Sequence, residues 1–469
     1  MKVSKNTQGL QKTKYLGSRP KNRLETEGRE EAHRVLSATP KGEASALQYG
    51  TLERILSREN MTKALKRVER NKGSHGIDGM ETYELRNFLS DKWAEIKTSI
   101  LQGTYKPNPV RRVEIPKPNG GMRLLGIPTV LDRLIQQAIA QELTLIFDKD
   151  FSRFSYGFRP NKSAHDAVKQ ANAFITEGYR WVVDLDLEKF FDKVNHDKLM
   201  ARVARKVKDK RVLKLIRRYL QSGIMINGLH VKSDEGTPQG GPLSPLLANI
   251  ILDDLDKELE KRGHKFCRYA DDCNIFVKSK RAGYRVKESV TKYIENILKL
   301  KVNENKSAVD RPWKRKFLGF SFYHVYGKSN IRIANSSVEK FKKKIKEITS
   351  RRKPIGIEDR IKRLNQVCIG WVNYFSIAKA KGLMKSLDQW IRRRLRMCEW
   401  KLWKRVRTRI KRLISLGMKP YFAKIYANTR KGYWHTSKSP ILTTTLTNQY
   451  IERLGYKSLS AQYAKMHVN

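Results

Sequence analysis

Acidic side chains inside apolar segments constrain the fold of this chain most strongly. Asp184 and Asp186 interrupt an apolar run that reads as a strand, and Asp271 and Asp272 occupy the turn of the strand–turn–strand segment Lys265–Lys278. Carboxylates are costly inside an apolar strand unless a cation pairs with them. Because side chains alternate along a strand, Asp184 and Asp186 share one face. A metal ion near that face is a simple explanation, and Asp186, Asp271 and Asp272 could meet if the two strand regions are neighbours in one sheet.

The chemistry open to such a site depends on how many carboxylates meet. Mg²⁺ takes oxygen ligands and keeps several waters, so two or three carboxylates plus substrate phosphates suffice. Two such ions about 4 Å apart can join a nucleotide to a growing strand. Asp186, Asp271 and Asp272 would then be the ligands, but spacing alone fits Asp184 as well as Asp186. Asp is also an ordinary turn residue, so the turn by itself is weak evidence.

Charge points to a polyanionic partner. The 469 residues include 98 Lys and Arg against 46 Asp and Glu, a formal net charge of +52, and 39% hydrophobic residues exclude wholesale disorder. Nucleic acid is the expected partner. Membrane-surface attraction is the alternative, but no apolar run approaches the roughly 20 residues of a spanning helix. The four cysteines form no C-x-x-C pair, which indicates a reducing, cytoplasmic location.

The central part of the chain alternates helices and strands, which predicts an α+β fold. A hairpin is expected around Pro118–Gly121. The apolar periodicity predicts helices at Tyr83–Leu101, Asp132–Phe147, His196–Gln221 and Ser244–Arg262.

Two loops carry residue types suited to phosphate binding. The glycines in Glu235–Pro245 permit close backbone approach to a ligand, and the loop ends at a helix start with free N–H groups. Lys117 and Arg123 bracket the hairpin turn and could both face one polyphosphate. A stiff loop before a helix and a pair of surface cations are the structural alternatives.

The C-terminal part is strongly basic. The segment Ile391–Arg412 holds eleven Lys and Arg against one Glu, an imbalance that internal ion pairs cannot relieve. We expect external phosphate contacts rather than a merely solvated helix face. Arg430, Lys431, Tyr433 and Trp434 form a basic and aromatic sequence suited to unpaired nucleic acid.

Taken together, these motifs resemble those of bacterial group II intron reverse transcriptase/maturases, most closely the class C branch. The resemblance covers about residues 50–469 and rests on several motifs in the family's order. They are Ser155–Pro160 (fingers), Arg180–His196 (motif A), Gly236–Pro245 (motif B), Tyr269–Asp272 (motif C), Phe317–Phe320 (primer grip), and Asn365-Gln366 with Gly370–Phe375 (maturase region).

The resemblance implies a right-hand polymerase, with fingers and a palm containing an antiparallel catalytic sheet, then a helical thumb and a small basic C-terminal domain. The implied regions are an N-terminal extension (49–105), fingers and palm (106–335), thumb or maturase X domain (336–415) and a basic DNA-binding D-like region (416–469). Residues 1–48 lie outside the resemblance; they are polar and mixed in charge, which indicates a flexible basic leader.

The resemblance also implies residue roles. Asp186, Asp271 and Asp272 would be the metal-binding catalytic carboxylates, with two Mg²⁺ ions (or Mn²⁺ as substitute), and Asp184 structural. The dNTP would be contacted by Lys117, Arg123, Gln239 and Phe191, and the Phe191 ring would exclude a 2′-OH. Phe317, Leu318, Gly319 and Phe320 would grip the primer, and Arg392, Arg393, Arg394, Arg405 and Arg407 would bind RNA and DNA.

The implied function is RNA-directed DNA synthesis for a mobile intron, with binding of the parent intron RNA, help in splicing, and retrohoming. The expected partners are group II intron RNA, an RNA template with DNA primer, target DNA and dNTPs, and no membrane; oligomeric state stays open. Only Cys398, His435 and His467 follow the maturase motif, so no zinc endonuclease module is expected. Alternatives are a non-catalytic splicing factor, a retron or defence reverse transcriptase, and, least favoured, an RNA-dependent RNA polymerase.

Overall fold

The computed structural model describes residues 51–116, 121–226, 229–231, 236 and 240–467. The chain divides after Gln48 into two units, of which the second, Tyr49–Asn469, is described below. The basic leader expected at 1–48 lies outside the described residues.

A four-stranded antiparallel sheet positions the acidic residues. Its strand order is β6-β7-β3-β8. The strands are β3 (Trp181–Leu185), β6 (Lys265–Tyr269), β7 (Asp272–Val277) and β8 (Ala308–Asp310). Strand β7 lies between β6 and β3, with Asp184 opposite Asn274. The two acidic strand regions are therefore neighbours in one sheet, which is the condition under which their carboxylates could meet.

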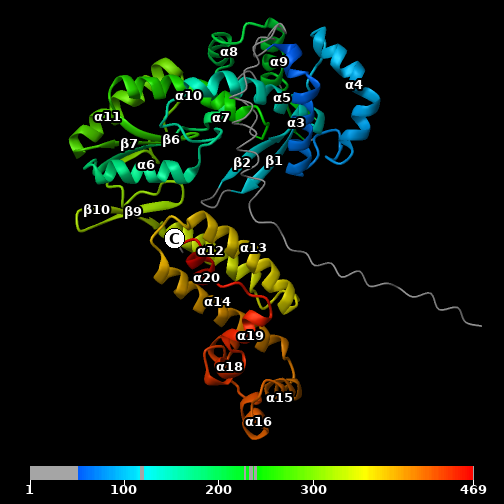
Figure 1. The fold of residues 1–469 in the computed structure, drawn as a ribbon, viewed down its shortest axis with the longest axis vertical. Coiled ribbons are helices and arrows are strands. Elements are labelled where there is room, and N and C mark those ends of the chain that lie inside the picture. Colours follow the sequence, from blue (N-terminus) through cyan, green and yellow to red (C-terminus); the bar gives the residue numbers. More distant parts are fainter. Residues whose placement is uncertain (1–50, 117–120, 227–228, 232–235, 237–239, 468–469) are drawn as a thin grey trace, which may run out of the picture. The chain divides into compact units, whose positions relative to one another are not determined.

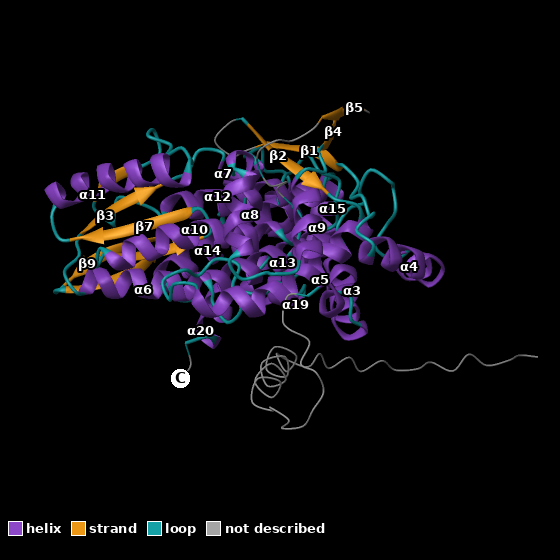
Figure 2. Cartoon of the chain, turned by 90° about the horizontal axis from the view of Figure 1, so that it is seen from above, coloured by secondary structure: helices purple, strands orange, loops and turns teal. Residues whose placement is uncertain are grey.

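Helices pack on both faces of this sheet. Helix α6 (Ala164–Thr176) contacts β6 and β7 on one face, and α11 (Lys280–Tyr293) contacts β3, β7 and β8 on the other (Figure 2). Ser163 caps α6 through a capping box with Asp166, the arrangement that satisfies free N–H groups at a helix start. The sheet is thus covered on both faces, while the turn between β6 and β7 stays at its edge.

A second sheet contains the expected hairpin. Its order is β2-β1-β4-β5, with β1 antiparallel to β2 and parallel to β4. Its strands are β1 (Val110–Pro116), β2 (Met122–Ile127), β4 (Ile224–Ile226) and β5 (Leu229–Val231). The hairpin is confirmed, although its turn at 117–120 lies outside the described residues.

The remaining elements before the C-terminal part are helical. They are α2 (Leu52–Ile55), α3 (Arg58–Asn71), α4 (Leu85–Leu101), α5 (Val130–Phe147), η1 (Asp148–Asp150), α7 (Phe190–Lys193), α8 (His196–Ala204), α9 (Lys210–Leu220), α10 (Ser244–Lys261) and η2 (Ile294–Leu298). Helix α10 carries Pro245 in its first turn, where its missing N–H has no cost.

One expected helix is wrong. The segment His196–Gln221 is two helices, α8 and α9, rather than one. The break falls before Asp209, whose carboxylate accepts the backbone N–H of Arg211 at 2.9 Å and so caps α9. The same carboxylate accepts the N–H of Leu52 at 3.0 Å. The cap and this distant contact favour a new helix start over continuation.

The C-terminal part begins with a hairpin and continues as helices (Figure 1). The hairpin is β9 (Phe320–Val325) and β10 (Lys328–Ile333). The helices are α12 (Asn335–Ile348), α13 (Ile357–Phe375), α14 (Lys381–Leu402), α15 (Val406–Ser415), α16 (Pro420–Ala427), α17 (Tyr433–Thr436), α18 (Pro440–Thr445), α19 (Asn448–Arg453) and α20 (Leu459–Lys465). This distribution agrees with an α+β core followed by a helical region.

Packing in this part does not follow the expected boundary between residues 415 and 416. One small hydrophobic cluster joins Trp400, Leu413, Ala423 and Leu442 across that boundary. Helix α20 packs instead against α13 and α14. Packing contacts therefore cross the expected boundary, because the chain returns to the thumb helices after α18, and the boundary itself stays a prediction.

No helix in the described part of the chain is long and apolar enough to cross a membrane. All four cysteines are buried as free thiols.

Candidate functional site

Three of the four acidic residues sit where strands β3 and β7 end or begin. Asp186 directly follows β3, and Asp271 and Asp272 form the turn into β7. Ala270 in this turn has φ of 58°, in the left-handed region. The turn therefore presents two consecutive carboxylates beside the end of the neighbouring strand.

Electrostatics show that these carboxylates influence one another. Although the Asp272 side chain reaches solvent, the surrounding protein displaces water from its carboxyl group. This desolvation, followed by the negative charges of Asp271, Asp184 and Asp186, raises the pKa of Asp272 to about 6. A site that concentrates like charges in this way favours a bound cation.

Two basic residues that sequence reasoning missed pair with the acids of β3. The guanidinium of Arg315 donates from Nε and Nη2 to Asp184 Oδ2, at 2.9 and 2.6 Å. Lys306 Nζ lies 3.1 Å from Asp186 Oδ2, and its side chain is 66% exposed. Asp184 is thus held by two hydrogen bonds from Arg315, whereas Asp186 is paired with a lysine side chain that is mostly exposed to solvent.

The backbone around Asp186 is fixed from the opposite side. Its N–H donates to Ser307 Oγ at 3.0 Å, and its carbonyl accepts the N–H of Asn303 at 2.8 Å. Leu187 forms an isolated bridge with Val302. The segment after η2 therefore holds the end of β3 in place.

A buried arginine that the sequence analysis did not identify supports the acidic turn from the protein interior. Arg268 is 0% exposed and donates to both carboxylate oxygens of Asp256 at 2.7 and 2.6 Å. Its remaining N–H groups donate to Asn249 Oδ1, Ser155 Oγ and the carbonyl of Ala270, at 3.0, 2.7 and 2.9 Å. All five donors are used, so Arg268 ties α10 and the Ser155 loop to the turn. An Arg directly before Tyr269 in an apolar strand was the only sequence signal.

The Ser155–Pro160 loop packs directly on this turn. A Cβ at Gly157 would lie 2.3 Å from the backbone N of Ala270, so only glycine fits there. The Gly157 carbonyl accepts a hydrogen bond from Asn249 Nδ2 at 2.8 Å. The loop is therefore part of the support of the turn.

The glycine-rich loop uses its glycines differently from our expectation. A Cβ at Gly240 would lie 2.5 Å from the carbonyl oxygen of Gly126 in β2, and one at Gly236 would lie 2.8 Å from the carbonyl oxygen of Phe191. His196 Nε2–H donates to the Gly236 carbonyl at 2.6 Å. The close approach that these described glycines permit is thus to neighbouring protein backbone.

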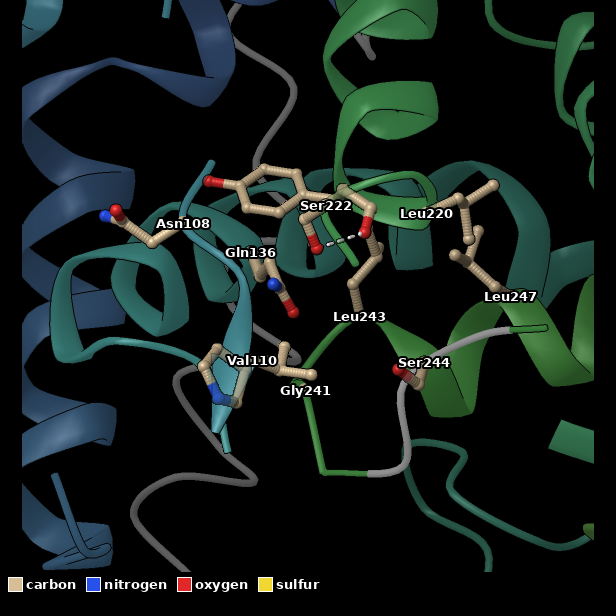
Figure 3. Close-up of a pocket in the computed structure, with 11 residues that line it drawn as sticks. Asn108, Val110, Gln136, Leu220, Ser222, Gly241, Leu243, Ser244 and Leu247 are labelled. Atoms are coloured by element: carbon tan, nitrogen blue, oxygen red, sulfur yellow. Dashed lines mark hydrogen bonds between the residues drawn. The ribbon is translucent and has the colours of Figure 1, made fainter. Parts of the chain in front are cut away.

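A small cavity lies beside the end of this loop (Figure 3). Its lining includes Gln136, Tyr219, Ser222, Gly241 and Ser244, and its volume is about 20 Å³. That volume holds about one water molecule. The cavity is therefore too small to be a nucleotide site.

The donor set fits a hard divalent cation. Carboxylate oxygens are the ligands Mg²⁺ prefers, and it commonly uses one or two of them with substrate phosphates and water. Within the described residues, no three Asp, Glu, His or Cys side chains form a ready-made metal cluster. The carboxylates would therefore complete a metal site together with substrate.

Comparison with known proteins gives the family. Residues 115–322 match the model of reverse transcriptase (RNA-dependent DNA polymerase), and residues 338–415 match that of the group II intron maturase-specific domain. Protein YkfC of Escherichia coli is 32% identical over 56% of this chain and 80% of its own length. The group II intron-encoded protein LtrA of Lactococcus lactis is 32% identical over 61% of this chain and 57% of its own. The chain belongs to the group II intron reverse transcriptase/maturase family.

A solved Cas6-RT-Cas1–Cas2 complex contains a chain 29% identical to this one. The match covers 54% of this chain and 43% of that one, with a TM-score of 0.35. Because this TM-score is low, we assign the reverse transcriptase fold from the family model and not from the solved structure. Reverse transcriptases as a family use divalent metal ions.

The residues expected to contact a nucleotide are only partly described. Lys117 and Gln239 lie outside the described residues. Arg123 lies in β2 opposite Ile115. Phe191 is half-buried against the core, while neighbouring Phe190 is in the core, and the two ring centroids are 5.1 Å apart. The reverse transcriptase roles of these residues stay predictions.

The four residues Phe317, Leu318, Gly319 and Phe320 form a tight turn before β9. Backbone hydrogen bonds join Phe317 and Phe320 in both directions, and Leu318 has φ of 51°. Tyr374 of the maturase region donates its hydroxyl to the Leu318 carbonyl at 2.8 Å. The turn is thus attached to thumb helix α13.

Three of the five arginines expected at nucleic acid make hydrogen bonds within the protein. Arg393 donates to the Trp434 carbonyl at 3.0 Å and lies over its ring at 3.8 Å. Arg394 donates to Thr349. Arg392 lies 3.5 Å from Glu452 and is 14% exposed. These contacts join α14 to other parts of the protein. Some of the arginine donors that we expected to contact phosphate are therefore used within the protein.

Arg405 and Arg407, by contrast, are exposed at the start of α15. Their exposure leaves them accessible to nucleic acid, and their binding role stays a prediction.

Proposed function

We propose that this chain copies RNA into DNA by two-metal nucleotidyl transfer, with Asp186, Asp271 and Asp272 as the metal-binding carboxylates. The observation that supports the proposal is the position of these carboxylates at the ends of the adjacent strands β3 and β7. Desolvation, followed by the charges of Asp271, Asp184 and Asp186, raises the pKa of Asp272 there to about 6. When bound, two Mg²⁺ ions would activate the primer hydroxyl and stabilise the leaving oxygens. Mn²⁺ is a substitute with the same oxygen-ligand chemistry.

Asp184 has a different role in this proposal. Its two hydrogen bonds from Arg315 use one oxygen and fix the carboxylate within the protein. Asp184 then positions Arg315 and the end of β3, and Asp186 is the ligand. This assignment decides between the two residues that spacing left open.

Nucleotide selection rests on the residues around this site. Lys117, Arg123 and Gln239 would contact the incoming dNTP. The positive side chains of Lys117 and Arg123 would stabilise the negative charge on its triphosphate. Phe191 would pack against the sugar and exclude a 2′-OH, because its ring leaves no room for that group. Its half-buried position beside the core supports a fixed ring rather than a mobile one.

The maturase-specific domain implies that the chain binds intron RNA. We propose that this RNA is the parent intron and that the chain assists its splicing and retrohoming, with target DNA as a further ligand. The Phe317–Phe320 turn would hold the primer. The proposed regions are N-terminal extension 49–105, fingers and palm 106–335, thumb 336–415 and a basic D-like region from 416.

RNA-templated primer extension tests the catalytic part. Wild-type protein with Mg²⁺ and dNTPs should extend a DNA primer on an RNA template, and Asp271→Asn should not. Intron splicing measured with both proteins separates the activities, because splicing assistance needs RNA binding and not the carboxylates. Equal extension by wild type and Asp271→Asn would contradict the assignment of the site.

A further inference from the structure

An open polar cavity lies between helix α14 and the helices that follow α17. Its volume is about 410 Å³, within the size range of small-ligand sites. It is lined by Gln389, Arg392, Arg396, Thr443, Thr447 and Asn448. Both arginines lie on α14, one helical turn apart, so their guanidinium groups share one face.

The two guanidinium groups are not neutralised by the protein around them. The only acidic partner found for them among the described residues is Glu452, 3.5 Å from Arg392 and itself 50% exposed. Burial, followed by the positive charge of Arg392, lowers the pKa of Arg396. Because two arginines face one acidic partner, the cavity keeps a net positive charge.

The donors of the cavity are only partly used. Arg392 Nε is buried and has no hydrogen-bond partner. Arg396 donates from Nε to the Leu446 carbonyl at 2.8 Å and from Nη2 to Asn448 at 3.1 Å. Thr447 Oγ1 accepts the N–H of Tyr450 and keeps its own hydrogen for donation. A buried donor without a partner is costly, so an acceptor from outside would be stabilised here.

We propose that this cavity, named the α14 pocket, binds a backbone phosphate of RNA, with Arg392 and Arg396 as its charged donors. Two guanidinium groups lining one cavity suit a phosphate, which accepts several hydrogen bonds at once. The cavity has room for the attached nucleoside, which a site for a bare ion would not need. This inference rests on the proposed RNA binding and adds the place and the chemical group.

RNA is favoured over other anions by position. Both arginines fall inside the match to the group II intron maturase-specific domain at 338–415. The remaining wall comes from α18 and α19, which lie beyond that match. A free phosphate has the same chemistry, and the experiment separates it from RNA.

The test compares Arg392→Gln with Arg453→Gln in the full chain. Arg453 lies on α19, is exposed, and does not line the pocket, so its variant removes the same charge nearby. Among the described residues Arg392 pairs with Glu452 at 3.5 Å, so the thermal unfolding temperature of both variants is measured and RNA affinity is compared at a temperature where both are folded. RNA affinity should fall about tenfold or more in Arg392→Gln, as for one charge-assisted contact.

Salt titration identifies the contact as a phosphate. The slope of log affinity against log salt should become shallower by roughly 0.7–0.9 in Arg392→Gln and change little in Arg453→Gln. Ethylation of single RNA phosphates should weaken wild-type binding at one position where Arg392→Gln is insensitive. Equal effects of the two substitutions, or no difference in the ethylation pattern, would overturn the proposal.

Inorganic phosphate is the second probe. If millimolar phosphate raises the unfolding temperature of wild type but not of Arg392→Gln, while their RNA affinities are equal, the RNA assignment is wrong. If wild type binds no RNA at all, the proposed function fails instead.

Discussion

Replacing Arg268 with Met should destabilise the protein and displace the acidic turn. The side chain of Met has similar length but donates no hydrogen bond, so the buried carboxylate of Asp256 loses its cation and the Ala270 carbonyl loses a donor. Breaking a fully buried pair from one side costs about 3–5 kcal/mol. Total stabilities are typically about 5–15 kcal/mol, so this loss is large.

A second variant separates stability from positioning. Arg268→Met with Asp256→Leu removes both charges, and such replacements are often neutral for stability. Most of the lost stability should therefore return. Polymerase activity should stay low, because the Ala270 carbonyl next to Asp271 still lacks the hydrogen bond that fixes the turn.

Urea denaturation followed by circular dichroism measures the effect, with Arg262→Met as the matched control. Glu258 lies in the last turn of α10 and Arg262 directly follows that helix. The two side chains form an ion pair, and both are partly exposed. Such a pair contributes about 0.3–0.5 kcal/mol. If Arg268→Met lowers the unfolding free energy by no more than 1 kcal/mol beyond Arg262→Met, roughly the scale of one neutral hydrogen bond, the argument is refuted.

Three further predictions concern the site and the thumb. Asp186→Asn should abolish primer extension, whereas Asp184→Asn should retain it within about tenfold, because removing a metal ligand costs several kcal/mol and each 1.4 kcal/mol is tenfold; equal losses would refute the assignment. Phe191→Ala should increase ribonucleotide incorporation by at least about tenfold in single-nucleotide assays, and unchanged discrimination would exclude a gate. Asp388 is buried, but five donors from Tyr456, Ser458, Leu459 and Ser460 lower its pKa. Its stabilisation is present above the unfolded pKa of about 3.9 and lost as pH falls through the folded pKa, so wild type should lose more thermal stability on acidification than Asp388→Asn.

The sequence predicted the acidic site because the free-energy cost of a carboxylate inside an apolar strand can be recognised from the neighbouring residues alone. Carboxylates inside an apolar strand need a cation wherever the strand goes, and that requirement indicated a metal ion near Asp184 and Asp186. Whether the strand of Asp271 lies beside them was left open. The support of the site was not predictable in this way. Arg268 uses Ser155, Asn249 and Asp256, which are spread along the chain and meet only in the folded sheet.

The contacts of the basic thumb arginines were not predictable from the sequence. Counting charges cannot tell which arginine faces solvent, because that depends on which helices pack against α14. Arg393 and Arg394 turned out to donate to carbonyl groups of α17 and of the residue after α12. Similarly, the break between α8 and α9 depends on a contact from Asp209 to Leu52, far away in sequence.

Single-nucleotide incorporation against Mg²⁺ concentration tests the central claim most directly. Wild type, Asp271→Asn and Asp272→Asn are each given a DNA primer on an RNA template and one dNTP under single-turnover conditions. We expect a saturable Mg²⁺ dependence in wild type and a loss on the order of 1,000-fold in both variants, as several kcal/mol of metal stabilisation implies. Incorporation within tenfold of wild type by either variant would contradict the account.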